Sequence, residues 1–524
     1  MKRKLVCLLL GISISLTVAG CNSKMGSIDE ITDSVVTSQE TGVEVKIEGA
    51  SYITLGDDKI TIDGKDATTD VQAAVYVAND IVYYEDGKDF TYGEGSKEDA
   101  HSKEEAEKHT VVHITKPGTY VLNGKLSAGQ IAVDLGEEAE DDPEAVVTLV
   151  LNNVDITCSV APGVIFYNVY ECGSKDEEEA TKDVDTSNAG ANVLIADGTN
   201  NTVNGSYVAR IYKSVELNEE GTEVIDSKKL HKYDAAFYSK MSMNMNGGEV
   251  GDGVLNINAE NEGLDSELHL TMNGGQINIV SGNDGINTNE DNVSVTTVNG
   301  GNLFIRVDGS TGEGDGIDSN GWLVINGGLV MTAACSHSMD AGIDSDKGIH
   351  INGGSVIATG NMLDHISESK QDYVVFTFPD KVKGDEKITL RNGDEELFFT
   401  MGNDYTCLIV SNEFIAKEGT YTLWKGEEQL AVVETEGGGM MMPGGFGGGQ
   451  MPEDFKPGEM PEGFDRGQMP ENFEPGEMPE GFDRDKMPGG GRGGNVHGQS
   501  NAENAVTEFE IKKGGAMYMV ISSR

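Results

Sequence analysis

Residues 262–275 have the sequence Glu-Gly-Leu-Asp-Ser-Glu-Leu-His-Leu-Thr-Met-Asn-Gly-Gly, a unit that recurs through the middle of the chain. Its closing triplet, Asn-Gly-Gly, recurs at intervals of 27, 26, 27 and 26 residues, beginning at Asn246, Asn273, Asn299, Asn326 and Asn352. Its opening motif recurs at Asp284–Thr288, Asp315–Ser319 and Ala341–Ser345, with a degenerate copy at Ala235–Ser239. A regular period of this length indicates a solenoid, in which each repeat stacks on the next.

Between these motifs apolar residues alternate with polar ones, as at Leu268, Leu270 and Met272. Alternation over four to six residues predicts strands with one buried face. Short strands, Gly turns and this period predict an all-β parallel β-helix with about 26 residues per coil and strands about 4.8 Å apart. The Gly residues permit positive φ, and a stacked Asn column can hydrogen-bond along the axis. A leucine-rich horseshoe would need a denser Leu pattern, which is lacking.

Composition divides the rest of the chain. Residues 366–435 are strand-rich without Gly turns and predict a small β appendage, which residues 504–524 would close. Residues 436–503 repeat Met-Pro among Gly and acidic residues and predict a disordered insertion. The resulting organisation is a leader (1–21), a linker and cap region (22–108), the β-helix (109–365), the appendage (366–435), the insertion (436–503) and the closing strands (504–524).

The N-terminus predicts export. Basic residues 2–4 precede an apolar run that ends in Val18-Ala19-Gly20-Cys21, which resembles a bacterial lipobox. We therefore expect a lipid on Cys21 and a location on the outer face of the cell membrane. The pairing of the other cysteines (Cys158, Cys172, Cys335, Cys407) cannot be deduced from spacing, and we expect small buried side chains.

Charge excludes one class of partner. The chain has 38 basic and 89 acidic residues in 524, a formal net charge of −51. Nucleic-acid binding needs clustered Lys and Arg to neutralise phosphates, so we expect no nucleic-acid partner.

The repeat register predicts a calcium site. Coils in register would stack one column of Asp265, Asn287, Asp318 and Asp344, and a second of Glu262, Asp284, Asp315 and Asp340. Carboxylates about 5 Å apart repel each other unless a cation lies between them. Ca²⁺ prefers oxygen ligands in Gly-rich turns, so these eight residues are the predicted ligands. The alternative is that each Asp caps its own turn.

These motifs resemble a family of clostridial extracellular carbohydrate-binding proteins. The resemblance rests on the lipobox, on the segments Leu149–Ile156 and Ile195–Val203, and on the paired Gly-Ile-Asp-Ser and Asn-Gly-Gly motifs. It implies a polysaccharide-lyase-like, right-handed parallel β-helix that carries calcium. It also implies non-catalytic binding of cellulose or of pectic polygalacturonate, polysaccharides of plant cell walls.

Two other functions stay open. A pectate-lyase-like enzyme would pair Ca²⁺ with a basic residue, for which Arg306 and Lys347 are the leading candidates within the helix; Arg210, Lys213 and Lys240 are the others. A protein-binding adhesin is the third possibility. Sugar rings stack on exposed aromatic side chains, and Trp322, directly after an acidic turn, is the candidate for that role, although packing is the commoner role of such a residue.

Overall fold

The computed structural model describes residues 23–27, 46–435 and 504–521, and the side chains from residue 46 onward. All of these residues except Asn504 belong to one compact unit. The predicted leader (1–21), its Cys21 and the insertion (436–503) lie outside the described residues. The described chain is almost entirely β. Its one α-helix, α2 (Lys103–Ala106), begins where Ser102 accepts a hydrogen bond from the Glu105 amide, and none of its helices has the length and hydropathy to cross a membrane.

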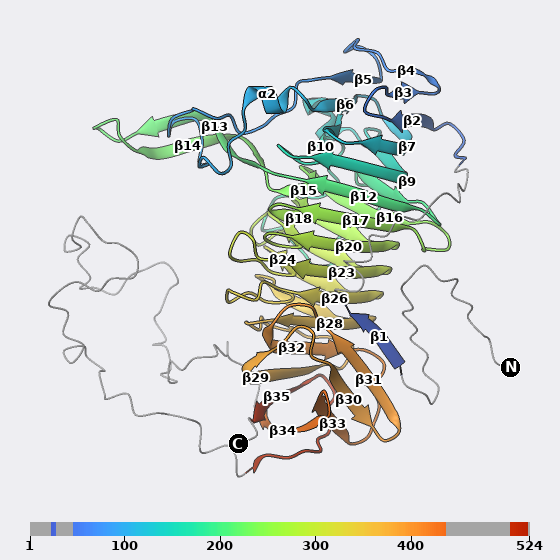
Figure 1. The fold of residues 1–524 in the computed structure, drawn as a ribbon, viewed down its shortest axis with the longest axis vertical. Coiled ribbons are helices and arrows are strands. Elements are labelled where there is room, and N and C mark those ends of the chain that lie inside the picture. Colours follow the sequence, from blue (N-terminus) through green and yellow to red (C-terminus); the bar gives the residue numbers. More distant parts are fainter. Residues whose placement is uncertain (1–22, 28–45, 436–503, 522–524) are drawn as a thin grey trace. The chain divides into compact units, whose positions relative to one another are not determined.

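A sheet of eight strands forms the first row of the repeats (Figure 1). Its strands pair in parallel, except that β5 (Val75–Ala78) is antiparallel to β6. In spatial order the others are β6 (Thr110–Ile114), β8 (Gly129–Asp134), β10 (Val164–Asn168), β15 (Ala235–Ser239), β18 (Glu262–Ser266), β21 (Ile286–Thr288) and β24 (Ile317–Ser319).

The larger sheet contains two further rows of parallel strands. One row comprises β2 (Ser51–Leu55), β7 (Gly118–Leu126), β9 (Val147–Cys158), β11 (Ala191–Ile195), β16 (Met243–Gly247), β19 (His269–Met272), β22 (Val295–Val298), β25 (Trp322–Ile325) and β27 (Gly348–Ile351). The other runs from the end of β9 through β12 (Asn200–Gly205), β17 (Val254–Ala259), β20 (Gln276–Ser281), β23 (Asn302–Val307), β26 (Leu329–Ala333) and β28 (Ser355–Gly360). The predicted strand pairing between successive repeats is confirmed.

The Asn-Gly-Gly turns fix this register. Asn273, Asn299, Asn326 and Asn352 each donate through Nδ2 to Oδ1 of the Asn one repeat earlier, at 2.9–3.0 Å. The second Gly of four triplets has φ of 82–85°, a conformation that a side chain strains. Both roles predicted for the triplet are therefore confirmed.

The interior of the stacked repeats is apolar. Residues from all three rows fill it, such as Leu264, Leu270 and Ile277, each at most 1% exposed. Burying a side chain of this size stabilises a fold by about 1.5–3 kcal/mol.

The appendage follows the stacked repeats and adds antiparallel strands. Here β28 pairs with β32 (Tyr405–Ser411), which pairs with β29 (Val374–Val382). The remaining strands are β30 (Ile388–Asn392), β31 (Glu395–Thr400), with which β1 (Ser23–Ser27) pairs, β33 (Tyr421–Lys425) and β34 (Glu428–Thr435). As predicted, a C-terminal strand, β35 (Ala516–Ile521), closes this sheet between β29 and β34. Residues 506–511, which belong to the predicted closing strands (504–524), form two isolated bridges instead, at Val506 and Phe509.

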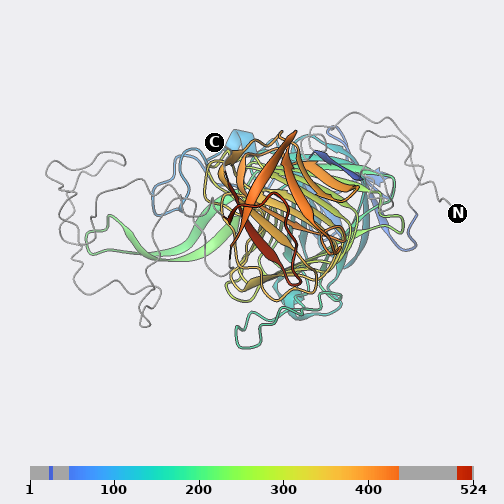
Figure 2. The same ribbon diagram turned by 90° about the horizontal axis from the view of Figure 1, so that it is seen from below.

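Other segments depart from the predicted pattern. Residues 61–62 and 65–66 form the short strands β3 and β4, and β2 joins the parallel row ahead of residue 109. A hairpin of β13 (Val208–Leu217) and β14 (Val224–Tyr233) projects to one side (Figure 2). Residues 171–189, which we call the strap, form a loop closed by a 2.8 Å hydrogen bond from the Gly190 amide to the Tyr170 carbonyl.

Candidate functional site

The first column of predicted ligands forms in register. Asp265 on β18 pairs with Asn287 on β21, and Asn287 pairs with Asp318 on β24. Asp344 follows in the next repeat, where its amide donates to the Ile317 carbonyl at 2.7 Å. Tyr238 precedes Asp265 in the same column, as the degenerate motif predicted.

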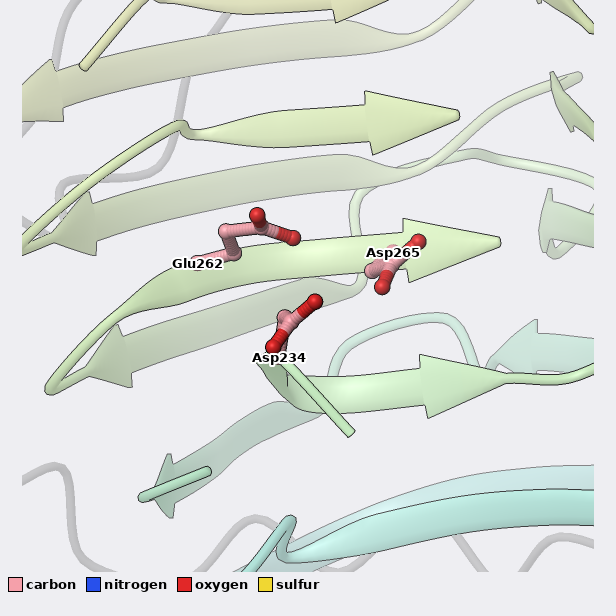
Figure 3. A group of neighbouring side chains, drawn as sticks. All are labelled: Asp234, Glu262 and Asp265. Atoms are coloured by element: carbon pink, nitrogen blue, oxygen red, sulfur yellow. The ribbon is translucent and has the colours of Figure 1, made fainter. Parts of the chain in front are cut away.

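Three carboxylates meet at the start of this column. Asp234, Glu262 and Asp265, the first acidic cluster, can each place an oxygen within 4.8 Å of the others (Figure 3). Glu262 and Asp265 lie at the two ends of β18, and Asp234 points toward that strand from the turn before β15. All three are buried, with Glu262 6% and Asp265 0% exposed.

Hydrogen bonds satisfy only part of the first acidic cluster. Asn287 donates to Glu262 Oε1 at 3.2 Å, and Asn289 donates to both oxygens of Asp265 at 2.9 and 3.1 Å. Glu262 Oε2 and Asn287 Oδ1 are buried and have no hydrogen-bond partner in the described part of the chain. An unpaired buried oxygen is costly, and a cation would satisfy both atoms.

Burial dominates the electrostatics here. It raises the pKa of Glu262 and Asp265 well above ordinary values, and neighbouring carboxylates raise both further. The pKa of Asp234 is raised by burial too, although Lys232 opposes the shift. Lys232 Nζ lies 2.5 Å from Asp234 Oδ2, so one ammonium faces three carboxylates.

A second acidic cluster lies further along the same flank. Asp315, Asp318 and Asp344 also bring carboxylate oxygens within 4.8 Å of one another, at half-buried positions. Burial raises the pKa of Asp315 to about 9 and those of Asp318 and Asp344 to about 7, and neighbouring carboxylates add to each shift. A cation would relieve both the repulsion and the desolvation.

Three members of the second predicted column, Asp284, Asp315 and Asp340, contact the backbone of an adjacent repeat. Asp284 Oδ1 accepts a hydrogen bond from the Asp315 amide at 2.6 Å, and Asp315 Oδ1 accepts from the Ala341 amide at 2.5 Å. Asp340 Oδ2 accepts from the Gly314 amide at 2.7 Å. The alternative to calcium was that each Asp caps its own turn, whereas these three side chains accept hydrogen bonds from amides of neighbouring repeats.

Five predicted ligands therefore lie in the two clusters, while Asp284, Asn287 and Asp340 lie around them. Asp234 and Lys232 were not predicted from the sequence. Both lie at the end of the β13–β14 hairpin, an insertion that has no counterpart in the other repeats. The feature of the sequence that could have identified Asp234 is its position directly before the degenerate motif.

Three of the five basic candidates, Arg210, Lys240 and Lys347, pair with acidic residues. Arg210 Nη1 lies 3.0 Å from Glu94 Oε1, and Lys240 Nζ lies 2.6 Å from Glu140 Oε1. Lys347 Nζ lies 3.7 Å from Glu177 Oε1 and 5.1 Å from the centre of the Trp322 ring.

Trp322 is half-buried at the start of β25.

The four cysteines of the described residues are free thiols. Cys158, Cys335 and Cys407 are buried, as expected, and Cys172 is half-buried.

Stacked parallel strands with buried acidic turns along one flank define an all-β repeat protein with two candidate cation sites. The chain belongs to the family of carbohydrate-binding domain-containing proteins, whose profile matches residues 108–428, more than half of the sequence. A solved structure titled the polysaccharide lyase-like protein from C. thermocellum, a gadolinium derivative, aligns over 61% of this chain and 99% of its own, with 20% identity and a TM-score of 0.33. The search of curated proteins found no match.

Proposed function

We propose that this protein is a right-handed parallel β-helix that binds polysaccharide without cleaving it and is stabilised by Ca²⁺. Membership of the carbohydrate-binding family supports the ligand class. The three rows of parallel strands support the architecture. We further propose a cell-surface location with a lipid on Cys21, which rests on the lipobox resemblance.

The observation that carries the calcium proposal is a pair of buried oxygens, Glu262 Oε2 and Asn287 Oδ1, that have no hydrogen-bond partner among the described residues. Both atoms are hard oxygen ligands. Glu262 belongs to the first acidic cluster, and Asn287 contacts Glu262 through its side-chain amide nitrogen. Ca²⁺ takes six to eight such oxygens in flexible geometry. The residues that would hold one ion are Asp234, Glu262, Asp265 and Asn287, and those for another are Asp315, Asp318 and Asp344.

Net charge constrains how an anionic ligand would bind. At −51 the protein repels pectic polygalacturonate. A bound Ca²⁺ would supply local positive charge and could bridge protein and polymer carboxylates. Binding of polygalacturonate should therefore require Ca²⁺, whereas binding of neutral cellulose need not.

The ion pair between Lys232 and Asp234 supports binding of polysaccharide over its cleavage. A β-eliminating lyase needs an unprotonated base beside its cation. Lys232 is the basic residue in contact with the first acidic cluster. Burial lowers its pKa, but Asp234 outweighs this and the net shift is upward. With Asp234 as its ion-pair partner at 2.5 Å, Lys232 is a poor candidate for an unprotonated base in the calcium-free protein.

One experiment separates these functions. The purified chain is mixed with polygalacturonate or insoluble cellulose, in Ca²⁺ or in EDTA, and both retention and ultraviolet absorbance are read. We expect retention without the absorbance of unsaturated products, with polygalacturonate retention lost in EDTA. Rising absorbance would indicate a lyase, and no retention on either polymer would favour an adhesin.

A further inference from the structure

The strap reaches from one repeat across several others. Its Gly173 lies so close to His269 that a Cβ would fall 2.7 Å from the imidazole. Further along, Lys175 Nζ lies 3.6 Å from Glu290 Oε2, and Glu177 Oε1 lies 3.7 Å from Lys347 Nζ. On the returning limb, the Thr186 hydroxyl lies 2.7 Å from Asn244 Oδ1 and from Thr271 Oγ1. The strap is therefore anchored at its base, and its acidic tip rests on Lys347.

Lys347 is held more firmly than its acidic partner. Its ammonium lies over the Trp322 ring, a cation–π arrangement, and its amide donates to the Gly321 carbonyl at 2.7 Å. Its side chain is 27% exposed, whereas that of Glu177 is 64% exposed. Exposed ion pairs are weak, so the Glu177 carboxylate can leave while the ammonium stays in place.

We infer that Lys347 is a binding site for the carboxylate of a hexuronate unit, that Trp322 positions its ammonium, and that Glu177 occupies the carboxylate position in the free protein. This inference rests on the proposed polysaccharide function and names the anionic sugar as its ligand at this place. Lys347 follows Asp344 by three residues, so a polymer bound there would run beside the second acidic cluster. Ca²⁺ at that cluster would bind a neighbouring uronate.

The strap supplies a matched control. Glu178 is adjacent to Glu177 and is the same residue type, but its side chain forms no ion pair in the described part of the chain. Glu177→Gln and Glu178→Gln therefore remove the same charge, and only Glu177→Gln releases Lys347.

The test measures affinity of the full chain for polygalacturonate in Ca²⁺, and for cellulose, by calorimetry or retention. We expect Glu177→Gln to bind polygalacturonate roughly two- to fivefold more tightly than Glu178→Gln, the range of an exposed ion pair. Lys347→Gln should weaken that binding by a similar factor, and neither variant should change cellulose binding. Trp322→Ala should match Lys347→Gln, and Trp322→Phe, which keeps a ring under the ammonium, should recover most of the loss.

Three results would overturn the inference, and a fourth would reject the function on which it rests. Equal affinities for the two Glu variants would mean that Glu177 does not compete with the ligand. Unchanged affinity in Lys347→Gln would place the uronate elsewhere and leave the proposed function standing. Wild-type binding to cellulose alone would reject the uronate ligand, and wild-type binding to neither polymer would reject the proposed function itself. Melting temperatures of each variant check that folding is intact.

Discussion

Asn287 Nδ2 donates a hydrogen bond to Glu262 Oε1 at 3.2 Å, while Glu262 Oε2 and Asn287 Oδ1 are buried and unpartnered within the described residues. The two residues lie on adjacent strands, β18 and β21, so the repeat itself holds them together. A buried polar network that leaves oxygens unsatisfied is less stable than an apolar core. The arrangement is explained if those oxygens bind a cation.

Replacing Glu262 with Gln should uncouple stability from calcium. The variant removes a buried charge, so we expect it to melt at a higher temperature than the wild type in EDTA. It also removes a ligand, so its melting temperature should rise less on addition of Ca²⁺. Thermal unfolding with and without Ca²⁺ measures both effects, and Glu178→Gln is the control for loss of one surface charge. A wild-type-like calcium response in Glu262→Gln would exclude Glu262 as a ligand.

The second acidic cluster predicts a pH-dependent effect of Asp318→Asn. A carboxyl with a raised folded pKa stabilises the fold most below its unfolded pKa of about 4, and this stability is lost as pH rises through the folded value. For Asp318 that value is about 7, because of burial and neighbouring carboxylates. In EDTA, Asp318→Asn should therefore be more stable than the wild type at pH 8, and this difference should become smaller at pH 5.

Calcium should reverse this order at pH 8, since the wild type binds the ion more tightly. Melting curves at the two pH values, with Ca²⁺ and with EDTA, provide the test. If Asp318→Asn is less stable than the wild type in EDTA at pH 8, the charged Asp318 carboxylate does not destabilise the fold at that pH.

Lys232 should compete with calcium for the first acidic cluster. Its ammonium already neutralises one of three carboxylates, so Lys232→Gln should raise calcium affinity and lower stability in EDTA. Calcium titration by calorimetry measures the first effect. Lys240→Gln, which breaks the ion pair with Glu140 instead, is the matched control. Weaker calcium binding in Lys232→Gln than in Lys240→Gln would contradict this role.

The asparagine column should stabilise the stack in proportion to its hydrogen bonds. Asn299→Ala loses two bonds, to Asn273 and from Asn326, while Asn352→Ala loses one, to Asn326. At about 0.5–1.5 kcal/mol per bond, we expect Asn299→Ala to lower the free energy of unfolding by about 1–2 kcal/mol and Asn352→Ala by about half of that. Chemical denaturation measures the difference. Equal losses would mean that the column acts only through local turn geometry.

The spacing of the repeats was enough to predict strand pairing and the column of Asp265, Asn287 and Asp318, because a fixed period places equivalent residues side by side. It could not predict Asp234 and Lys232 at the base of a hairpin insertion, since an insertion has no register with its neighbours. The same reason hid the contact between Glu177 and Lys347. The capping of adjacent repeats by Asp284 and Asp340 depends on side-chain rotamers, which spacing does not specify.

Calcium titration of the full chain at pH 8 by calorimetry, for the wild type and for Glu262→Gln, tests the central claim most directly. We predict saturable binding to the wild type and the loss of one binding event in the variant, with polygalacturonate retention requiring the same Ca²⁺ concentrations. Absence of calcium binding to the wild type, or identical titrations of the two proteins, would contradict the account.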